Sequence, residues 1–265
     1  MPKNSDDKYE DMDIGQKAAR IGLDSEQDII NAINSNERFR NILRKCLENL
    51  GLDSSGDLSS NKGATQTKKD ITIRIGQNNI GISIKSSKKT SFHQTDRRRL
   101  EKWREFLKMP DEIYDIIKEA ALRISNNPKA KFIESKNQTL IKNFFLNHYE
   151  IIIAEIFTRN EEDLLLFLIN NKMDKIIYIY RMNDVLEFLY ENISDNISFS
   201  NKGIIKLGDF LSVQRKGGNG KHITIPKTDW QHPGNQLQFK FSPLKFSDYI
   251  EKKKPIPFCK IDYKF

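Results

Sequence analysis

Apolar and polar residues alternate on both sides of a short polar stretch, residues 76–79 (Gly-Gln-Asn-Asn). The flanking runs, Ile71–Ile75 and 80–84, are rich in isoleucine. Such β-branched runs around a turn rich in Gly and Asn predict a β-hairpin. If the four-residue loop is symmetric, Ile75 pairs with Ile80, and this pair fixes the register of the hairpin.

Counting outward from that pair places Thr72 opposite Ser83 and Asp70 opposite Lys85. Side chains alternate between the faces of a strand, so all four share one face. A carboxylate there can hold Mg²⁺, and an ammonium can orient an attacking water or stabilise charge on a phosphate during phosphodiester hydrolysis. The alternative is an ordinary cross-strand ion pair at a sheet edge. Such a pair contributes little to the stability of the protein when it is exposed at the surface.

Helical spacing of apolar residues continues over longer stretches of the chain. It predicts helices within residues 11–50, 100–124, 139–168 and 183–192. The stretch 51–67 is rich in Ser, Gly, Asp and Asn and is predicted to be a loop that leads into the hairpin.

Further short strands are predicted in the second half of the chain, at residues 175–181, 204–207, 210–215, 221–225 and 237–241. Helices flanking a mixed sheet indicate an α/β or α+β fold, with a β-rich part at the C-terminal end. We expect a catalytic core over residues 1–190 and a basic recognition region over residues 191–265.

The chain has 265 residues and is 37% hydrophobic, which fits a globular protein rather than a disordered one. Its net charge is +8, and residues 202–265 carry 13 basic against 5 acidic residues. Such an excess at one end indicates a polyanionic partner, most simply nucleic acid, although a lysine-rich tail such as Lys252–Lys254 also keeps a protein in solution. No apolar run of spanning length and no signal-peptide pattern is found, so we expect a cytoplasmic protein.

Cysteine and histidine give no sign of a metal centre of their own. The two cysteines, Cys46 and Cys259, lack metal-ligand spacing and are predicted to be reduced thiols. The histidines also show no zinc-site spacing; they are His93, His148, His222 and His232.

A basic, glycine-rich stretch, residues 213–221, is the second candidate for chemistry. Arg and Lys match the acceptors of guanine, and Gln or Asn can contact adenine. Downstream, residues 235–241 alternate, so that Leu237, Phe239 and Phe241 can anchor one face while polar side chains occupy the other. The glycine-rich stretch at residues 213–221 lacks Walker-type and Gly-x-Gly-x-x-Gly patterns, so it is not expected to be a nucleotide-binding loop. A basic hairpin tip without DNA contact remains the alternative.

A third stretch, residues 88–99, is strongly basic and suits phosphate contacts, while Phe92 or Gln94 could insert at the bases. The alternative is a solvated helix start that Thr95 or Asp96 caps.

These pieces, in this order, resemble the small type II restriction endonucleases of the PD-(D/E)xK superfamily, the group that contains MspI and the HinP-type, GCGC-cutting enzyme. The pattern Gly15-x-Lys17-x-Ala19-x-x-Gly22-x-x-x-Glu26 matches the first helix of the HinP-type enzyme, whose glutamate lies near the metal. Asp70 and Ser83-Ile84-Lys85 match the motif strands, and Phe92-x-Gln94-x-Asp96 matches a segment whose glutamine enters DNA.

The resemblance implies a Mg²⁺-dependent, site-specific endonuclease that cuts double-stranded DNA at a short, GC-rich palindrome. It implies catalytic roles for Asp70, Lys85, Ser83 and Glu26, with Asp70 and Glu26 on the metal. The expected DNA-binding residues are Gln94, Arg97, Gln214, Arg215, Lys216, Lys221, Asn235, Gln238 and Lys240. It also implies a monomer or weak homodimer, and a cognate DNA methyltransferase as the partner enzyme of the same system.

Two departures from the family pattern affect this expectation. Ser83 occupies the usual second acidic position, so metal binding has to rely on Asp70, Glu26, the scissile phosphate and water. The chain is also longer than the relative between Lys221 and Asn235, which prevents transfer of the target sequence. A DNA-binding protein without catalysis and a structure-directed repair nuclease are the alternative functions.

Overall fold

The computed structural model describes residues 14–64, 67–87, 93–170, 175–193, 196–200, 203–218 and 223–262. Contacts group the chain into two compact units. Unit 1 comprises Met1–Thr90, Glu161–Val185 and Ser247–Phe265, and unit 2 comprises Ser91–Asn160 and Leu186–Phe246. The single boundary expected near residue 190 is therefore replaced by units that alternate along the chain.

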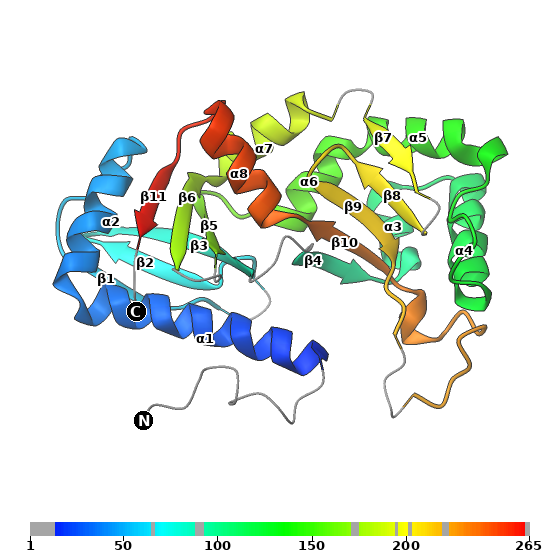
Figure 1. Ribbon diagram of the computed structural model, residues 1–265, viewed down its shortest axis with the longest axis horizontal. Coiled ribbons are helices and arrows are strands. Elements are labelled where there is room, and N and C mark those ends of the chain that lie inside the picture. Colours follow the sequence, from blue (N-terminus) through cyan, green and yellow to red (C-terminus); the bar gives the residue numbers. More distant parts are fainter. Residues whose placement is uncertain are drawn as a thin grey trace. The chain divides into compact units, whose positions relative to one another are not determined.

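Unit 1 is built on a six-stranded mixed sheet with the order β1-β2-β3-β5-β6-β11 (Figure 1). Its strands are β1 (Leu58–Lys62), β2 (Ile71–Ile75), β3 (Asn78–Ser87), β5 (Leu164–Asn170), β6 (Ile176–Arg181) and β11 (Cys259–Asp262). Strands β3 and β5 are parallel, and the other neighbours are antiparallel. Strand β1 lies within residues 51–67, which the sequence analysis predicts to be a loop. The prediction misses the strand because its Ser- and Asn-rich sequence has no alternation of apolar residues.

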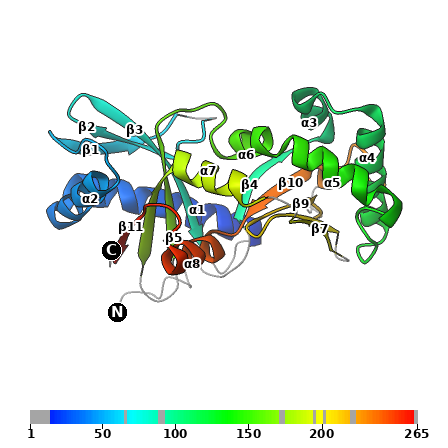
Figure 2. The same cartoon turned by 90° about the horizontal axis from the view of Figure 1, so that it is seen from above.

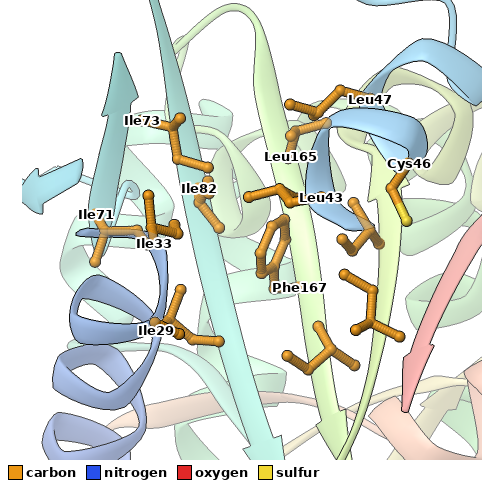
Figure 3. Close-up of a cluster of buried hydrophobic side chains, with 14 of the residues drawn as sticks. Ile29, Ile33, Leu43, Cys46, Leu47, Ile71, Ile73, Ile82, Leu165 and Phe167 are labelled. Atoms are coloured by element: carbon orange, nitrogen blue, oxygen red, sulfur yellow. The ribbon is translucent and has the colours of Figure 1, made fainter. Parts of the chain in front are cut away.

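Helices α1 (Ile14–Ser35) and α2 (Glu37–Asn49) lie on one side of strands β1–β3 (Figure 2). Figure 3 shows the resulting core, in which Ile29 and Ile33 of α1 and Leu43 of α2 pack toward Ile73 and Phe167 of the sheet. The expected helical pattern over residues 11–50 is thus present as two helices, which Asn36 separates by capping the second one through Phe39 N. Burial of these isoleucines and leucines supplies much of the stability of unit 1.

Strand β5 corrects the prediction that residues 139–168 are helical. Residues Leu164 to Ile169 are all buried, and β5 has neighbours on both sides, β3 and β6. A strand covered on both faces reads as a continuous apolar run, which periodicity alone does not distinguish from a buried helix.

The cysteines also differ from expectation. Cys46 of α2 and Cys259 of β11 form a disulfide, with 213 residues of sequence separation. Packing of α2 against the edge strand β11 brings the two side chains together, a tertiary contact that cysteine spacing does not reveal. The prediction of two reduced thiols is therefore wrong for this structure.

Unit 2 is built on a five-stranded antiparallel sheet with the order β4-β10-β9-β8-β7. Its strands are β4 (His93–Arg98), β7 (Ile197–Phe199), β8 (Ile204–Leu207), β9 (Leu211–Arg215) and β10 (Leu237–Phe241). Its helices are α3 (Leu100–Leu107), α4 (Asp111–Asn126), α5 (Gln138–Asn147) and α6 (Tyr149–Phe157), with short 3-10 turns η2 (Ser135–Asn137) and η3 (Pro233–Asn235). Residues 223–225 are not a strand, in contrast to the prediction for 221–225, whose first two residues lie outside the described residues.

The apolar face of this sheet packs on its helices. The ring of Trp103 lies 4.7 Å from that of Phe239, and the ring of Phe157 lies 5.2 Å from that of Phe241. The alternation in residues 237–241 predicted this burial, and Leu237, Phe239 and Phe241 are all buried.

Two helices, α7 (Met182–Glu191) and α8 (Pro243–Lys253), each contribute residues to both units. Among the described residues, no helix is long and apolar enough to cross a membrane.

Candidate active site and nucleic-acid interface

The β2–β3 hairpin carries the first group of candidate residues, in a register two residues away from the predicted one. The turn is Gly76-Gln77, and Ile75 pairs with Asn78 instead of Ile80. Gly76 has a φ of +56°, a left-handed conformation that glycine adopts readily, and two-residue turns with such a glycine are favoured in hairpins. Because the shift is an even number of residues, every side chain stays on its predicted face.

Asp70 precedes β2 and is held by the hairpin itself. Its backbone N–H donates to Ile82 O at 2.8 Å, and its carboxylate Oδ2 accepts from Ile84 N at 2.5 Å. Lys85 Nζ lies 3.5 Å from the same oxygen. Both contacts of the carboxylate fall on Oδ2, and the one with Ile84 N fixes it to the backbone of β3.

Lys85 is positioned by two further contacts. Its Nζ donates to Ser83 Oγ at 2.8 Å and to Ile84 O at 3.1 Å. Ser83 is fully buried, and only 15% of the Lys85 side chain is exposed. The ammonium is thus oriented next to the carboxylate by a buried hydroxyl.

Glu26 of α1 lies close enough to the same group to feel its charges. Burial raises the pKa of Glu26, and the negative charge of Asp70 raises it further, while Lys62 and Lys85 act in the opposite direction. One contact ties α1 to β3 close by, since Ser25 Oγ donates to Ser86 Oγ at 3.1 Å. The predicted residues Glu26, Asp70, Ser83 and Lys85 are therefore brought together in unit 1.

Lys62 belongs to this group but was missed by the sequence analysis. It lies on β1, opposite Ile71, and its charge acts on Glu26. The stretch around it has no alternation that would have predicted a strand, so the sequence held no signal for it.

Two carboxylates close enough for the charge of Asp70 to raise the pKa of Glu26 are a suitable donor pair for a divalent cation. Mg²⁺ is commonly held by one or two carboxylates, with water and substrate phosphate oxygens completing its shell. Among the described residues, no group of three or more Asp, Glu, His or Cys side chains could hold a metal alone. Glu26 and Asp70 therefore fit Mg²⁺ with shared ligation, and they do not fit a closed transition-metal site.

In unit 2, the antiparallel register collects the second group of candidates. Gln238 of β10 lies between Gln214 of β9 and Arg97 of β4, and paired residues share a face. Lys240 lies opposite Gln94, and Gln238 Nε2 donates to Gln94 Oε1. The polar face of this sheet thus carries five of the predicted DNA-binding residues: Gln94, Arg97, Gln214, Gln238 and Lys240.

This polar face is short of acidic partners. Burial lowers the pKa of Lys240, and burial together with the charge of Arg97 lowers the pKa of Lys216. Within the described part of the chain, no salt bridge joins Arg97, Lys216 or Lys240 to a carboxylate. Cations placed near each other without acids favour an anionic or acceptor-rich ligand.

Two predicted residues lie elsewhere. Arg215 pairs with Leu237 on the apolar face and is buried, and Asn235 is buried in the η3 turn. Lys221 lies outside the described residues. Asn235, one of the expected DNA-binding residues, therefore does not belong to the polar face of the sheet.

Comparison with known proteins finds a likeness in fold but none in sequence families. No family model matches the sequence, and no curated protein matches it. The fold is similar to that of the restriction endonuclease MspI, crystallised in complex with its cognate DNA, with a TM-score of 0.59 and 17% identity. The alignment covers 89% of this chain and 95% of MspI. The chain therefore has a restriction-endonuclease-like fold, with helices flanking two sheets.

Proposed function

We propose that the protein is a Mg²⁺-dependent, site-specific endonuclease of the type II restriction class that cuts double-stranded DNA. The observation that carries the proposal is the contact of Lys85 with Asp70 and Ser83, with Glu26 close enough to feel the charges of Asp70 and Lys85. The restriction-endonuclease-like fold supports it, as does the cationic face of unit 2, where Arg97, Lys216 and Lys240 form no salt bridge with a carboxylate of the described residues.

In this proposal Asp70 and Glu26 hold the metal. Bound Mg²⁺ supplies Lewis-acid chemistry, lowering the pKa of a coordinated water and neutralising phosphate charge. Lys85 holds the attacking water or the phosphate oxygen beside Asp70, and no covalent enzyme intermediate is needed. Ser83 keeps the Lys85 ammonium in place through its hydroxyl.

DNA recognition is assigned to the polar face of the unit 2 sheet. Gln94, Gln214 and Gln238 can both donate to and accept from base edges. Arg97, Lys216 and Lys240 provide charge for phosphates or guanine acceptors. A GC-rich palindrome, a monomer or weak dimer, a protecting DNA methyltransferase and a cytoplasmic location complete the proposal.

Digestion of a DNA of known sequence tests the function. Incubation with Mg²⁺ should give discrete fragments with one common end sequence, and EDTA should prevent cutting. Asp70→Asn and Lys85→Ala should abolish cleavage while a gel shift on the target DNA persists. Retained cutting by either variant would contradict the assigned active site, and random fragments would indicate a nuclease without sequence specificity.

A second candidate is a DNA-binding protein without catalysis, and the buried Ser83 at the usual acidic position is the observation that favours it. This candidate predicts a sequence-specific gel shift and an intact plasmid at every Mg²⁺ concentration.

A further inference from the structure

Arg215 lies on the opposite side of the sheet from the proposed reading face. Its pairing with Leu237 places it in the apolar row, whereas Gln214 and Gln238 are in the polar row. Only 8% of Arg215 is exposed. A base edge that meets Gln238 therefore does not meet the Arg215 guanidinium.

The contacts of Arg215 are with an amide instead of an acid. Its Nε donates to Asn235 Oδ1 at 2.7 Å, and burial lowers its pKa. By contrast, half-buried Arg98 of the same sheet pairs with Asp96 and Glu155. A buried cation without a carboxylate partner lowers the stability of the folded protein. Arg215 therefore calls for a role other than charge pairing.

Asn235 transmits the contact to a longer segment, residues 227–236. Its Nδ2 donates to Asp229 O at 2.7 Å and to Lys227 O at 3.2 Å. The segment is closed by Gly234 N, which donates to His232 Nδ1 at 2.9 Å. A side chain at Gly234 would bring its Cβ within 2.8 Å of His232 Nδ1 and 3.2 Å of Arg215 Nη2, so only glycine lets the turn pass this close.

The same segment holds the residues that follow β9. Lys216 N donates to Gln236 O at 2.8 Å, and Gly217 N donates to Gly234 O at 3.0 Å. Gly217 has a φ of +68°, the left-handed conformation that allows the chain to turn here. Arg215 is thus enclosed by a segment that sets the position of Lys216, next to Arg97.

We infer that Arg215 and Asn235 are positioning residues that lock segment 227–236 onto the end of β9, and so fix Lys216 and Gln238 for sequence reading. The inference rests on the proposed function. It assigns a role to the stretch in which this chain is longer than its relative, and it moves Arg215 from base contact to support.

Hydrogen exchange in the DNA-free protein tests the lock directly. Asn235→Ala should speed exchange of the Lys216 and Gly217 amides about tenfold or more, because their acceptors lose their anchor. Arg215→Ala should do the same, and the double variant should exchange no faster than either single one. Lys245→Ala, which removes a distant cation that bonds Asp209, should leave both amides unchanged.

DNA binding separates support from contact. Both variants should weaken binding to the target and to all singly substituted targets by a similar factor, since no one base is read by either residue. Loss of discrimination at a single base pair in Arg215→Ala would overturn the inference. Unchanged amide exchange in Asn235→Ala would also overturn it. So would additive effects of Arg215→Ala and Asn235→Ala on the exchange rates in the double variant.

The two proposals fail in different ways. A wild-type protein that binds all sequences equally would contradict the proposed function, while the exchange rates would still decide whether the lock exists. If Arg215→Ala melts far below wild type, Asn235→Ala gives the same test with the guanidinium in place.

Discussion

Lys85 donates to the buried hydroxyl of Ser83 at 2.8 Å, which links the proposed catalytic cation to the residue two positions earlier on β3. The hydroxyl brings no charge, so its effect on Lys85 is orientation. Because Lys85 also contacts Asp70, loss of the hydroxyl leaves the ammonium free to close on the carboxylate and away from DNA.

Ser83→Ala should therefore lower the rate of DNA cleavage by about tenfold, the effect of losing one hydrogen bond to a charged group. Single-turnover cleavage of target DNA measures it, and equilibrium binding of the same DNA should hardly change. Ser83→Thr keeps a hydroxyl and should therefore cleave faster than Ser83→Ala. An Ala variant with full cleavage would show that Ser83 has no part in orienting Lys85.

Glu26 gives a prediction about stability and pH. Its pKa is raised in the folded state, so folding is opposed when Glu26 is ionised, and this destabilisation grows as pH rises through the ordinary range of a glutamate. Glu26→Gln should thus raise the melting temperature at pH 7 without metal, by up to about 2 °C. At a pH well below that range the two proteins should melt together.

Added Mg²⁺ provides the control for Glu26. The cation should raise the melting temperature of the wild type, because it binds only the folded protein, and should have a much smaller effect on Glu26→Gln. Equal stabilisation of both proteins by Mg²⁺ would remove Glu26 from the metal site.

Two neighbouring arginines on β4 should behave in opposite ways. Arg98 contacts Asp96 and Glu155, both buried, so Arg98→Ala leaves two buried carboxylates with reduced compensation and should destabilise the protein by about 3–5 kcal/mol. Arg97 is exposed, and Arg97→Ala should change stability by less than about 0.5 kcal/mol while weakening DNA binding. Urea denaturation and DNA titration of both variants separate the two roles. Equal loss of stability would contradict the assignment of β4 faces.

The disulfide predicts sensitivity to reductant. Cys46–Cys259 closes a loop of 213 residues, so reduction should lower the free energy of unfolding by about 2–5 kcal/mol. Urea denaturation with and without dithiothreitol measures this loss. The variant with both cysteines changed to Ser should be indifferent to dithiothreitol. Full alkylation of both thiols in the native, unreduced protein would show that the bridge does not form.

The sequence predicted those features that local patterns control. The hairpin faces and the burial of Leu237, Phe239 and Phe241 follow from alternation and turn residues. The alternation of side chains along the hairpin predicted that Asp70 and Lys85 share a face. The position of Glu26 near them was expected only from the resemblance to restriction endonucleases. The features that the sequence did not predict depend on tertiary contacts. Strand β5 is buried on both faces, so its sequence shows no alternation of apolar and polar residues. Arg215 lies on the apolar face of the sheet because it pairs with Leu237.

The parallel pairing of β3 with β5 has a consequence for synthesis. Ser83 and Lys85 on β3 lie opposite Leu166 and Leu168, which the ribosome adds only after it has made all of residues 88–163. The edge strand β11 comes later still, at the far end of the chain. A nascent chain therefore carries the β2–β3 hairpin, with Asp70 and Lys85, well before β5 and β11 complete the sheet that holds it.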